Sequence, residues 1–140
     1  MFLSKISKKD INFDIYGNLN PFCRINILYK KHHIGYCNLV REGNVACLAD
    51  IFIYCHRRPM FNFIPFFKFG VNYRKNGFGT LLLDKAIEVC SEMKVLKIIG
   101  RAQGQLEILI PWYRKHNFNI DNDNNLSFNL SSLCGNNNKI

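Results

Sequence analysis

The feature that most constrains the fold of this chain is a change of hydrophobic period at Gly79. Before it, apolar and polar residues alternate in several short stretches, whereas from Gly79 to Met93 apolar residues recur every three or four positions. Alternation is typical of half-buried strands, and the longer period is typical of an amphipathic helix. The sequence therefore predicts a sheet followed by a helix. The helical stripe consists of Gly79, Leu82, Leu83, Ala86, Ile87, Cys90 and Met93.

Four strands are predicted before this helix, over residues 12–16, 23–30, 34–40 and 45–55. In the fourth strand, simple alternation predicts that Asp50 shares a face with aromatic residues. One face of that strand is expected to carry Val45, Cys47, Ala49, Ile51 and Ile53, and the other Leu48, Asp50, Phe52 and Tyr54.

Beyond the helix, the pattern predicts one strand, a second helix and a hairpin. Residues 95–99 form a β-branched run, a second helical stripe follows through Leu106 and Tyr113, and residues 118–120 and 126–130 flank a turn. Pro111 lies within that stripe and would cost about 3 kcal/mol inside a helix. We therefore expect the second helix to be kinked, or to begin later than its stripe.

This order of elements predicts one α/β (α+β) domain with a mixed, mainly antiparallel sheet flanked by two main helices. A chain of 140 residues suits a single domain. We assign residues 1–134 to the domain and residues 135–140 to a frayed C-terminal tail.

Composition excludes several classes of protein. Hydrophobic residues make up 48% of the chain, which is too many for a disordered protein. The longest apolar runs fall well short of the ~20 residues that a membrane helix needs, and residues 1–10 lack the apolar region of a secretory signal. The six cysteines form no C-x-x-C pair, which argues against a disulfide frame or a zinc site. We therefore expect a cytoplasmic protein without a metal.

The net charge of +9 predicts an attraction for phosphate groups. Those groups could belong to a nucleic acid, an anionic membrane surface or a nucleotide-like cofactor. Arg57, Arg58 and Lys68 lie among aromatic residues, which also suits a small basic nucleic-acid-binding module, but the chain contains no recognised nucleic-acid-binding motif. His116 borders a charged segment and is expected at the surface.

The segment that leads into the first helix is the main candidate for chemistry. Its glycines permit a tight turn and let backbone N–H groups approach an oxygen-rich ligand, while the helix N-terminus adds roughly half a positive charge. Asn76 and Gly77 could instead form a hairpin turn, but a helical stripe follows them rather than a strand. We predict a phosphate-binding loop formed by Arg74, Lys75, Asn76, Gly77, Phe78, Gly79 and Thr80.

Three segments, in the expected order, resemble the GNAT superfamily of acetyl-CoA-dependent N-acyltransferases. Residues 74–79 read R-x-x-G-x-G, which resembles the pyrophosphate loop of that family. Residues 49–51 (A-D-I) are similar to the A-E-I of some members, and residues 112–118 are similar to the family's F-Y-x-x-x-G-F segment. Asn117 replaces the glycine of that segment, which asparagine can do in the left-handed conformation.

The resemblance implies direct transfer of an acetyl group from acetyl-CoA to a primary amine of a small molecule or a protein. It implies that the loop amides bind the CoA pyrophosphate, with the Arg74 side chain as a charge partner. It further implies Tyr113 as the general acid that protonates the CoA thiolate and Asp50 as the general base. Each catalytic role has a structural alternative. Tyr113 could be a core residue, and Asp50 could pair with a neighbouring arginine.

The first half of the chain departs from the family pattern. Only residues 17–22 separate the first two predicted strands, where the family has one or two helices, so the N-terminal helical region is reduced. We hypothesise that the aromatic loop of residues 56–69 replaces that wall as a substrate lid or a homodimer contact. A hydrophobic plug over the sheet is the alternative for this loop. A non-catalytic homologue that binds acyl-CoA as a sensor is a further alternative for the whole chain.

Overall fold

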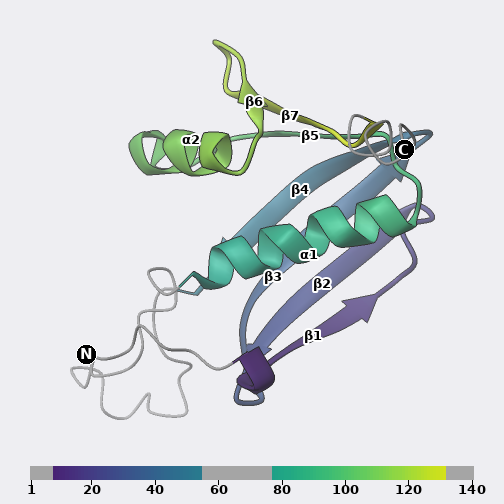
Figure 1. Ribbon diagram of the computed structural model, residues 1–140, viewed down its shortest axis with the longest axis vertical. Helices are drawn as coiled ribbons and strands as arrows, with labels where there is room; N and C mark the ends of the chain where they lie inside the picture. The colour runs from purple at the N-terminus through teal and green to yellow at the C-terminus, as the bar shows by residue number, and fades with distance from the viewer. Residues whose placement is uncertain (1–7, 55–76, 132–140) are drawn as a thin grey trace, which may run out of the picture.

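The computed structural model describes residues 8–54 and 77–131, and within them seven strands form one sheet in the order β1-β2-β3-β4-β5-β7-β6 (Figure 1). A 3-10 turn, η1 (Lys8–Asp10), precedes the first strand. The strands are β1 (Ile11–Tyr16), β2 (Phe22–Tyr29), β3 (His32–Glu42), β4 (Val45–Ile53), β5 (Lys97–Arg101), β6 (Asn119–Ile120) and β7 (Asn125–Asn129), and the helices are α1 (Phe78–Glu92) and α2 (Leu106–Lys115).

The sheet is mixed and mainly antiparallel, as the sequence predicts. β4 and β5 pair in parallel, and every other pair of neighbouring strands is antiparallel. α1 lies in the connection between β4 and β5, because parallel neighbours need a crossover rather than a tight turn. A stretch of five residues joins β1 to β2, so the helical region that the family has there is indeed reduced.

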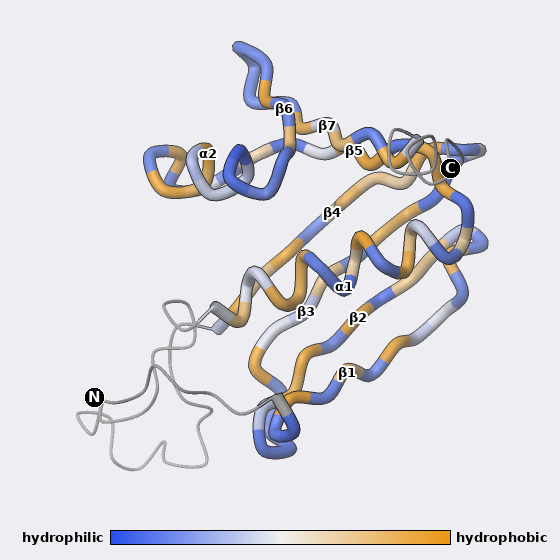
Figure 2. The backbone as a smooth tube through the Cα atoms, in the orientation of Figure 1, coloured by the Kyte–Doolittle hydropathy of each residue, from blue (hydrophilic) through white to orange (hydrophobic). Residues whose placement is uncertain are grey.

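The core lies between α1 and one face of the sheet. α1 packs across β2, β3 and β4, and hydrophobic and hydrophilic residues alternate along these elements (Figure 2). Each fully buried aliphatic side chain contributes roughly 1.5–3 kcal/mol to the stability of this layer. The buried residues that line it include Cys23, Ile25, Ile27, Cys37, Leu39, Leu82, Leu83, Ala86 and Cys90.

A β-bulge in β4 corrects the predicted faces of that strand. Asn38 pairs with Asp50 whereas Leu39 pairs with Leu48, so Ala49 is an extra residue without a partner in β3. A bulge shifts the alternation by one residue. Leu48 therefore points into the core on the same side as Ile53, whereas simple alternation predicts that these two side chains lie on opposite faces. Asp50 lies on the other face, and it is exposed.

The second helix also differs from its prediction. α2 begins at Leu106, where the stripe begins, and contains Pro111 in its interior, so of the two predicted alternatives, a kink or a later start, the later start is wrong. Gln105 supplies the carbonyl that accepts the N–H groups of Ile108 and Leu109, which closes the first turn before the proline is reached. After α2, Asn117 has a φ of +72°, and this confirms the left-handed conformation expected at that position.

Several predicted features lie outside the described residues. They are the aromatic loop of residues 56–69, the loop residues Arg74, Lys75 and Asn76, and the C-terminal tail of residues 135–140. In the described part of the chain, neither helix has the length and apolar character needed to cross a membrane.

Candidate active site

The N-terminus of α1 presents backbone donors that meet no acceptor in the described part of the chain. Gly77 caps the helix in the left-handed conformation, with φ +81° and ψ +5°, and its carbonyl accepts the N–H of Leu81 at 3.1 Å. Within the described ranges, the N–H groups of Gly77, Gly79 and Thr80 donate to no acceptor. The first turn carries no acidic residue that would offset the positive end of the helix dipole. This end of α1 is therefore suited to an anion.

α2 packs directly against this helix end. Trp112 Nε1 donates a hydrogen bond to Thr80 Oγ1 at 3.2 Å, and His116 Nε2 lies 3.2 Å from the same oxygen. A Cβ atom on Gly79 would lie 3.5 Å from the Trp112 ring, which is ordinary van der Waals contact. The first turn of α1 is thus held in place by Trp112 on α2 and by His116, which directly follows α2.

β4 and β5 separate beside the same helix end. Their parallel pairing runs from Val45–Lys97 to Leu48–Gly100 and stops there. β4 then continues to Ile53, whereas β5 ends at Arg101 and the chain turns toward α2 (Figure 1). Among the described strands, none pairs with the part of β4 that contains Asp50 on the β5 side. An extended ligand can reach β4 backbone groups through such an opening.

Asp50 lies on the face of the sheet that α1 does not cover. Its Oδ2 accepts a hydrogen bond from Asn38 Nδ2 at 3.4 Å, and Asn38 Oδ1 accepts one from Arg24 Nη1 at 3.3 Å. The arginine pairing considered from the sequence is therefore indirect, since an asparagine stands between the two charged groups. In the described residues, Asp50 Oδ1 makes no hydrogen bond.

Tyr113 is buried on the core side, with 4% of its surface exposed. Its ring packs edge-on against Trp112 and Phe118, at centroid distances of 4.8 Å and 5.4 Å. Burial, with a smaller contribution from Cys37, raises the pKa of Tyr113 to about 12, so the phenol is protonated at neutral pH. Its hydroxyl makes no hydrogen bond to any residue in the described segments. Tyr113 is thus a core residue, and within the described segments no acceptor occupies its hydroxyl.

The thiol of Cys37 lies within electrostatic reach of both candidate catalytic residues. Burial raises the pKa of Cys37 far above its ordinary value, and Cys90, Cys23 and Asp50 raise it further. Cys37 in turn contributes to the raised pKa of Tyr113. Cys37 pairs with Ile51, next to Asp50, and its side chain is buried in the core together with Tyr113, whereas Asp50 is exposed on the opposite face of the sheet.

This chain is similar to known proteins in its structure rather than in its sequence. No family sequence model matches the chain, and no curated protein matches its sequence. Among solved structures, a GNAT family acetyltransferase from Elizabethkingia anophelis with acetyl-CoA bound matches with a TM-score of 0.64 at 12% identity, covering 88% of this chain and 100% of that one. This chain has the GNAT fold.

Two further solved structures have the GNAT fold at comparable similarity. PaiA N-acetyltransferase from Thermoplasma acidophilum, in complex with coenzyme A, has a TM-score of 0.59 and 16% identity over 77% of this chain, which spans 60% of that protein's length. The ribosomal-protein-S18-alanine N-acetyltransferase from Escherichia coli has a TM-score of 0.56 and 12% identity, with coverages of 79% and 68%.

Within the GNAT fold of this chain, Trp112 links one part of the predicted site to another, because it contacts Thr80 and Gly79 at the helix end and its own neighbour Tyr113 on α2. Asp50 follows the bulge in β4, on the face of the sheet that α1 does not cover. Phe78 belongs to the predicted loop, but its side chain is fully buried in the core, where its ring centroid lies 5.2 Å from that of Tyr29.

Four residues that contact the site were not assigned to it from the sequence. Trp112 and His116 contact the Thr80 side chain, Asn38 donates to Asp50, and Arg24 donates to Asn38. His116 is half-buried rather than at the surface. Each contact joins positions at least 12 residues apart, and no local pattern marks it.

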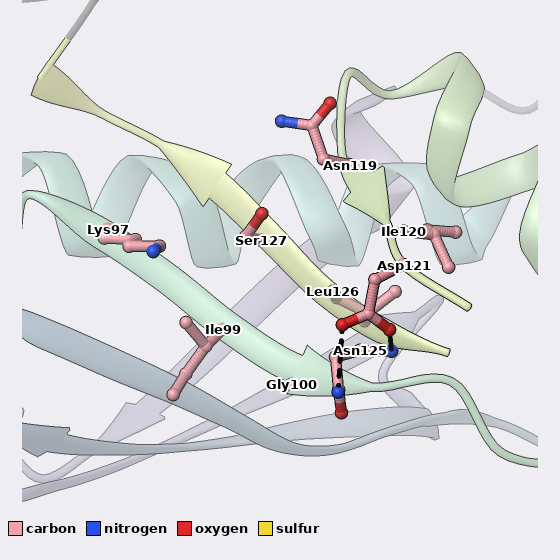
Figure 3. Close-up of a pocket in the computed structure, with 9 residues that line it drawn as sticks. All are labelled: Lys97, Ile99, Gly100, Asn119, Ile120, Asp121, Asn125, Leu126 and Ser127. Carbon is pink, nitrogen blue, oxygen red and sulfur yellow. Dashed lines mark hydrogen bonds between the residues drawn. The ribbon is translucent and has the colours of Figure 1, made fainter. Parts of the chain in front are cut away.

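A shallow groove of about 450 Å³ lies on the uncovered face of the GNAT fold, over β5, β7 and β6 (Figure 3). The Asp121 carboxylate at its rim accepts the backbone N–H groups of Asn125 and Asp123 and the Asn125 side-chain amide. The hydrogen bonds from Asn125 are the main cause of the lowered pKa of Asp121. The side chain therefore stabilises the turn between β6 and β7. In residues 8–54 and 77–131, no cluster of three His, Cys, Asp or Glu side chains is arranged to hold a metal ion.

Proposed function

We propose that this chain is an acetyl-CoA-dependent N-acetyltransferase that transfers the acetyl group directly to a primary amine. The observation that carries the proposal is the set of N–H groups at the N-terminus of α1 that donate to no acceptor within the described residues, beside the opening between β4 and β5 in a GNAT fold. The solved structure from Elizabethkingia anophelis, which has the same fold, contains acetyl-CoA.

In this proposal the helix end holds the diphosphate of acetyl-CoA. The N–H groups of Gly77, Gly79 and Thr80 would donate to phosphate oxygens, and the helix dipole would favour their negative charge. Arg74, Lys75 and Asn76, which precede the described helix end, complete the proposed loop, with Arg74 as the charge partner. The left-handed conformation of Gly77 supports the role, since it turns the chain into the helix without placing a side chain over the amides.

The proposed chemistry divides between the two faces of the sheet. An acceptor ammonium loses one proton to Asp50, and its nitrogen then attacks the thioester carbonyl carbon. This attack forms the C–N bond of the amide, and the C–S bond of the thioester then breaks. The nitrogen gives up a second proton, which is transferred to the sulfur. Backbone N–H groups of β4 near residues 51–53 are the candidates to polarise the carbonyl oxygen.

Tyr113 is proposed to stabilise the leaving sulfur. The phenol has a pKa of about 12, whereas a free thiol has a pKa of about 8.5, so complete proton transfer from Tyr113 would be uphill by about 5 kcal/mol. The buried hydroxyl acts as the acid of this step by donating a hydrogen bond to the developing thiolate. Proton transfer is then completed from the attacking nitrogen.

Thermal melting with acetyl-CoA tests the diphosphate site. A ligand at about 100 times its Kd stabilises the folded state by about 2.7 kcal/mol. We expect Gly77→Asp to abolish this stabilisation, because the new carboxylate would repel phosphate. Gly43→Asp is the matched control, since Gly43 also has a positive φ (+64°) with open space around it, in the turn between β3 and β4. Equal stabilisation of both variants by acetyl-CoA would contradict the proposal.

Turnover is tested by release of free thiol from acetyl-CoA in the presence of several amines: spermidine, tryptamine, and peptides with a free α-amine or a lysine side chain. Binding of acetyl-CoA without thiol release would indicate a non-catalytic acyl-CoA sensor. Stabilisation by single-stranded DNA that disappears as salt is raised, with no response to acetyl-CoA, would instead indicate a nucleic-acid-binding module.

A further inference from the structure

A row of three polar side chains crosses the uncovered face of the sheet and ends on Asp50. Arg24, Asn38 and Asp50 occupy directly opposed positions on β2, β3 and β4. Arg24 Nη1 donates to Asn38 Oδ1 at 3.3 Å, and Asn38 Nδ2 donates to Asp50 Oδ2 at 3.4 Å. Side chains opposed in this way on neighbouring strands lie within reach of one another. The row therefore connects a fixed cation to a carboxylate through one amide.

The first member of the row is itself held in place. Arg24 Nε donates to Asn26 Oδ1 at 3.1 Å, and the guanidinium carbon lies 4.2 Å from the centre of the Tyr36 ring. A guanidinium over an aromatic face is attracted by the ring electrons. Arg24 therefore has a defined orientation even though it lies on the sheet surface.

That orientation determines which way the Asn38 amide faces. Arginine has donors only, so the group that Asn38 turns toward Arg24 must be its oxygen. The Nδ2 group then faces Asp50, whose ionised carboxylate has acceptors only. With Oδ2 occupied in this way, Oδ1 is the Asp50 oxygen that remains without a hydrogen bond in the described part of the chain.

The bulge at Ala49 makes this row possible. Without the extra residue, alternation from Leu48 would place Asp50 one position out of register with Asn38. Bulges reorient side chains in this manner. The bulge thus aims Asp50 toward the uncovered face, at the point where pairing between β4 and β5 has ended.

We propose that Asn38 and Arg24 are positioning residues that hold Asp50 Oδ2, so that Oδ1 faces the acceptor amine. This proposal rests on the proposed function, in which Asp50 is the base. Asp50 is exposed, so its side chain would otherwise rotate among several rotamers. A displacement of about 1 Å in a reacting group can lower the rate about 100-fold. We therefore expect a loss of about 10- to 100-fold in kcat when Asn38 is removed.

A double-mutant cycle separates positioning from a general structural role. With the amine that gives the fastest thiol release, Asn38→Ala is expected to lower kcat about 10- to 100-fold and to leave the KM for acetyl-CoA unchanged. In the Asp50→Asn background the same substitution should have no further effect, because the group that it positions is gone. Additive losses would overturn the proposal. Asn12→Ala is the matched control, since Asn12 is an exposed asparagine on the same face, in β1, and lies outside the row.

Arg24 provides the second test. Arg24→Met removes the Nε and Nη1 donors of Arg24 and should lower kcat, as Asn38→Ala does. Arg24→Lys should restore part of this loss, because it places one donor near Asn38 Oδ1. Melting temperatures measured for every variant show whether the fold persists. An Arg24→Met variant that folds and keeps full kcat would overturn the role of Arg24.

A measurement without turnover distinguishes failure of this proposal from failure of the proposed function. In ¹⁵N-labelled protein, the side-chain NH₂ resonances of Asn38 should shift in Asp50→Ala and in Arg24→Met, and should not shift in Asn12→Ala. No shift in the first two variants would overturn the row, whatever the activity. If the Asn38 resonances shift in both variants as expected but the wild-type protein releases no thiol, the proposed function is overturned, and with it the catalytic role of the row.

Discussion

Trp112 Nε1 donates to Thr80 Oγ1 at 3.2 Å, and this hydrogen bond fastens α2 to the first turn of α1. Trp112 also packs against Gly79 and, through its ring, against its neighbour Tyr113. One tryptophan thus contacts both the helix end proposed to hold the diphosphate and the tyrosine proposed to face the sulfur. The relative position of these two parts depends on α2 docking against α1.

The first prediction concerns this contact. Trp112→Phe keeps an aromatic ring but removes the N–H, so it should destabilise the protein by about 1–2 kcal/mol, the usual cost of losing one partly buried hydrogen bond. Urea denaturation measures this loss. Thr80→Val removes the acceptor, and the double variant should lose less than the sum of the two single losses. Strict additivity would show that the bond contributes nothing to stability.

The second prediction contrasts the two glycines at the helix start. Gly77 has a φ of +81°, so Gly77→Ala should destabilise the protein by about 1–2 kcal/mol, even though its Cβ would meet open space. Gly79 has no positive φ, and its Cβ would only touch Trp112 and Ile53. Gly79→Ala should therefore be neutral, or stabilising by up to about 1 kcal/mol. Thermal or urea unfolding of both variants checks the contrast, and a reversed order would contradict it.

The third prediction concerns alkaline pH. Burial raises the pKa of Tyr113 from 10.0 to about 12, so the folded protein binds this proton more tightly than the unfolded chain does. The resulting stability is fully present below pH 10 and is lost as pH rises toward 12, by about 3 kcal/mol at most. Tyr113→Phe should lose less stability than the wild type over this interval.

Urea unfolding at several pH values between 9 and 12 measures this difference in slope. The buried thiols of Cys37 and Cys90, whose pKa values are raised mainly by burial, destabilise both proteins as the pH rises. The Cys90 contribution is therefore common to both proteins, and the difference in slope reports Tyr113 together with its coupling to Cys37. Parallel pH profiles for the wild type and Tyr113→Phe would show that Tyr113 ionises normally.

The fourth prediction concerns the pairing of β3 with β4. A Cβ on Gly35 would lie 2.5 Å from the Phe52 carbonyl oxygen and 2.6 Å from the Ile53 side chain. Gly35→Ala should therefore force β3 away from β4 and cost about 1–3 kcal/mol, as overpacking does in other cores. Gly43→Ala provides a comparison in which strain comes from a positive φ alone. A Gly35→Ala variant with wild-type stability would mean that the two strands adjust freely.

Much of the architecture was determined by the sequence alone, because periodicity is a local property. Alternation located β1 to β4, and the stripe from Gly79 located α1, which begins one residue earlier at Phe78. The left-handed conformation of Asn117 was also predictable, since it depends on the backbone preference of a single residue.

Tertiary structure decided what the local pattern could not. The bulge at Ala49, and with it the side of the sheet on which Asp50 lies, depends on how β4 pairs with β3, and alternation in one strand carries no information about its partner. Pro111 is accommodated inside α2, where intrinsic propensity alone favoured a kink or a later start. The contacts of Trp112 with Thr80 and of Asn38 with Asp50 arise only when distant segments pack together. Local preferences thus determined the elements, and long-range packing determined which side chains meet.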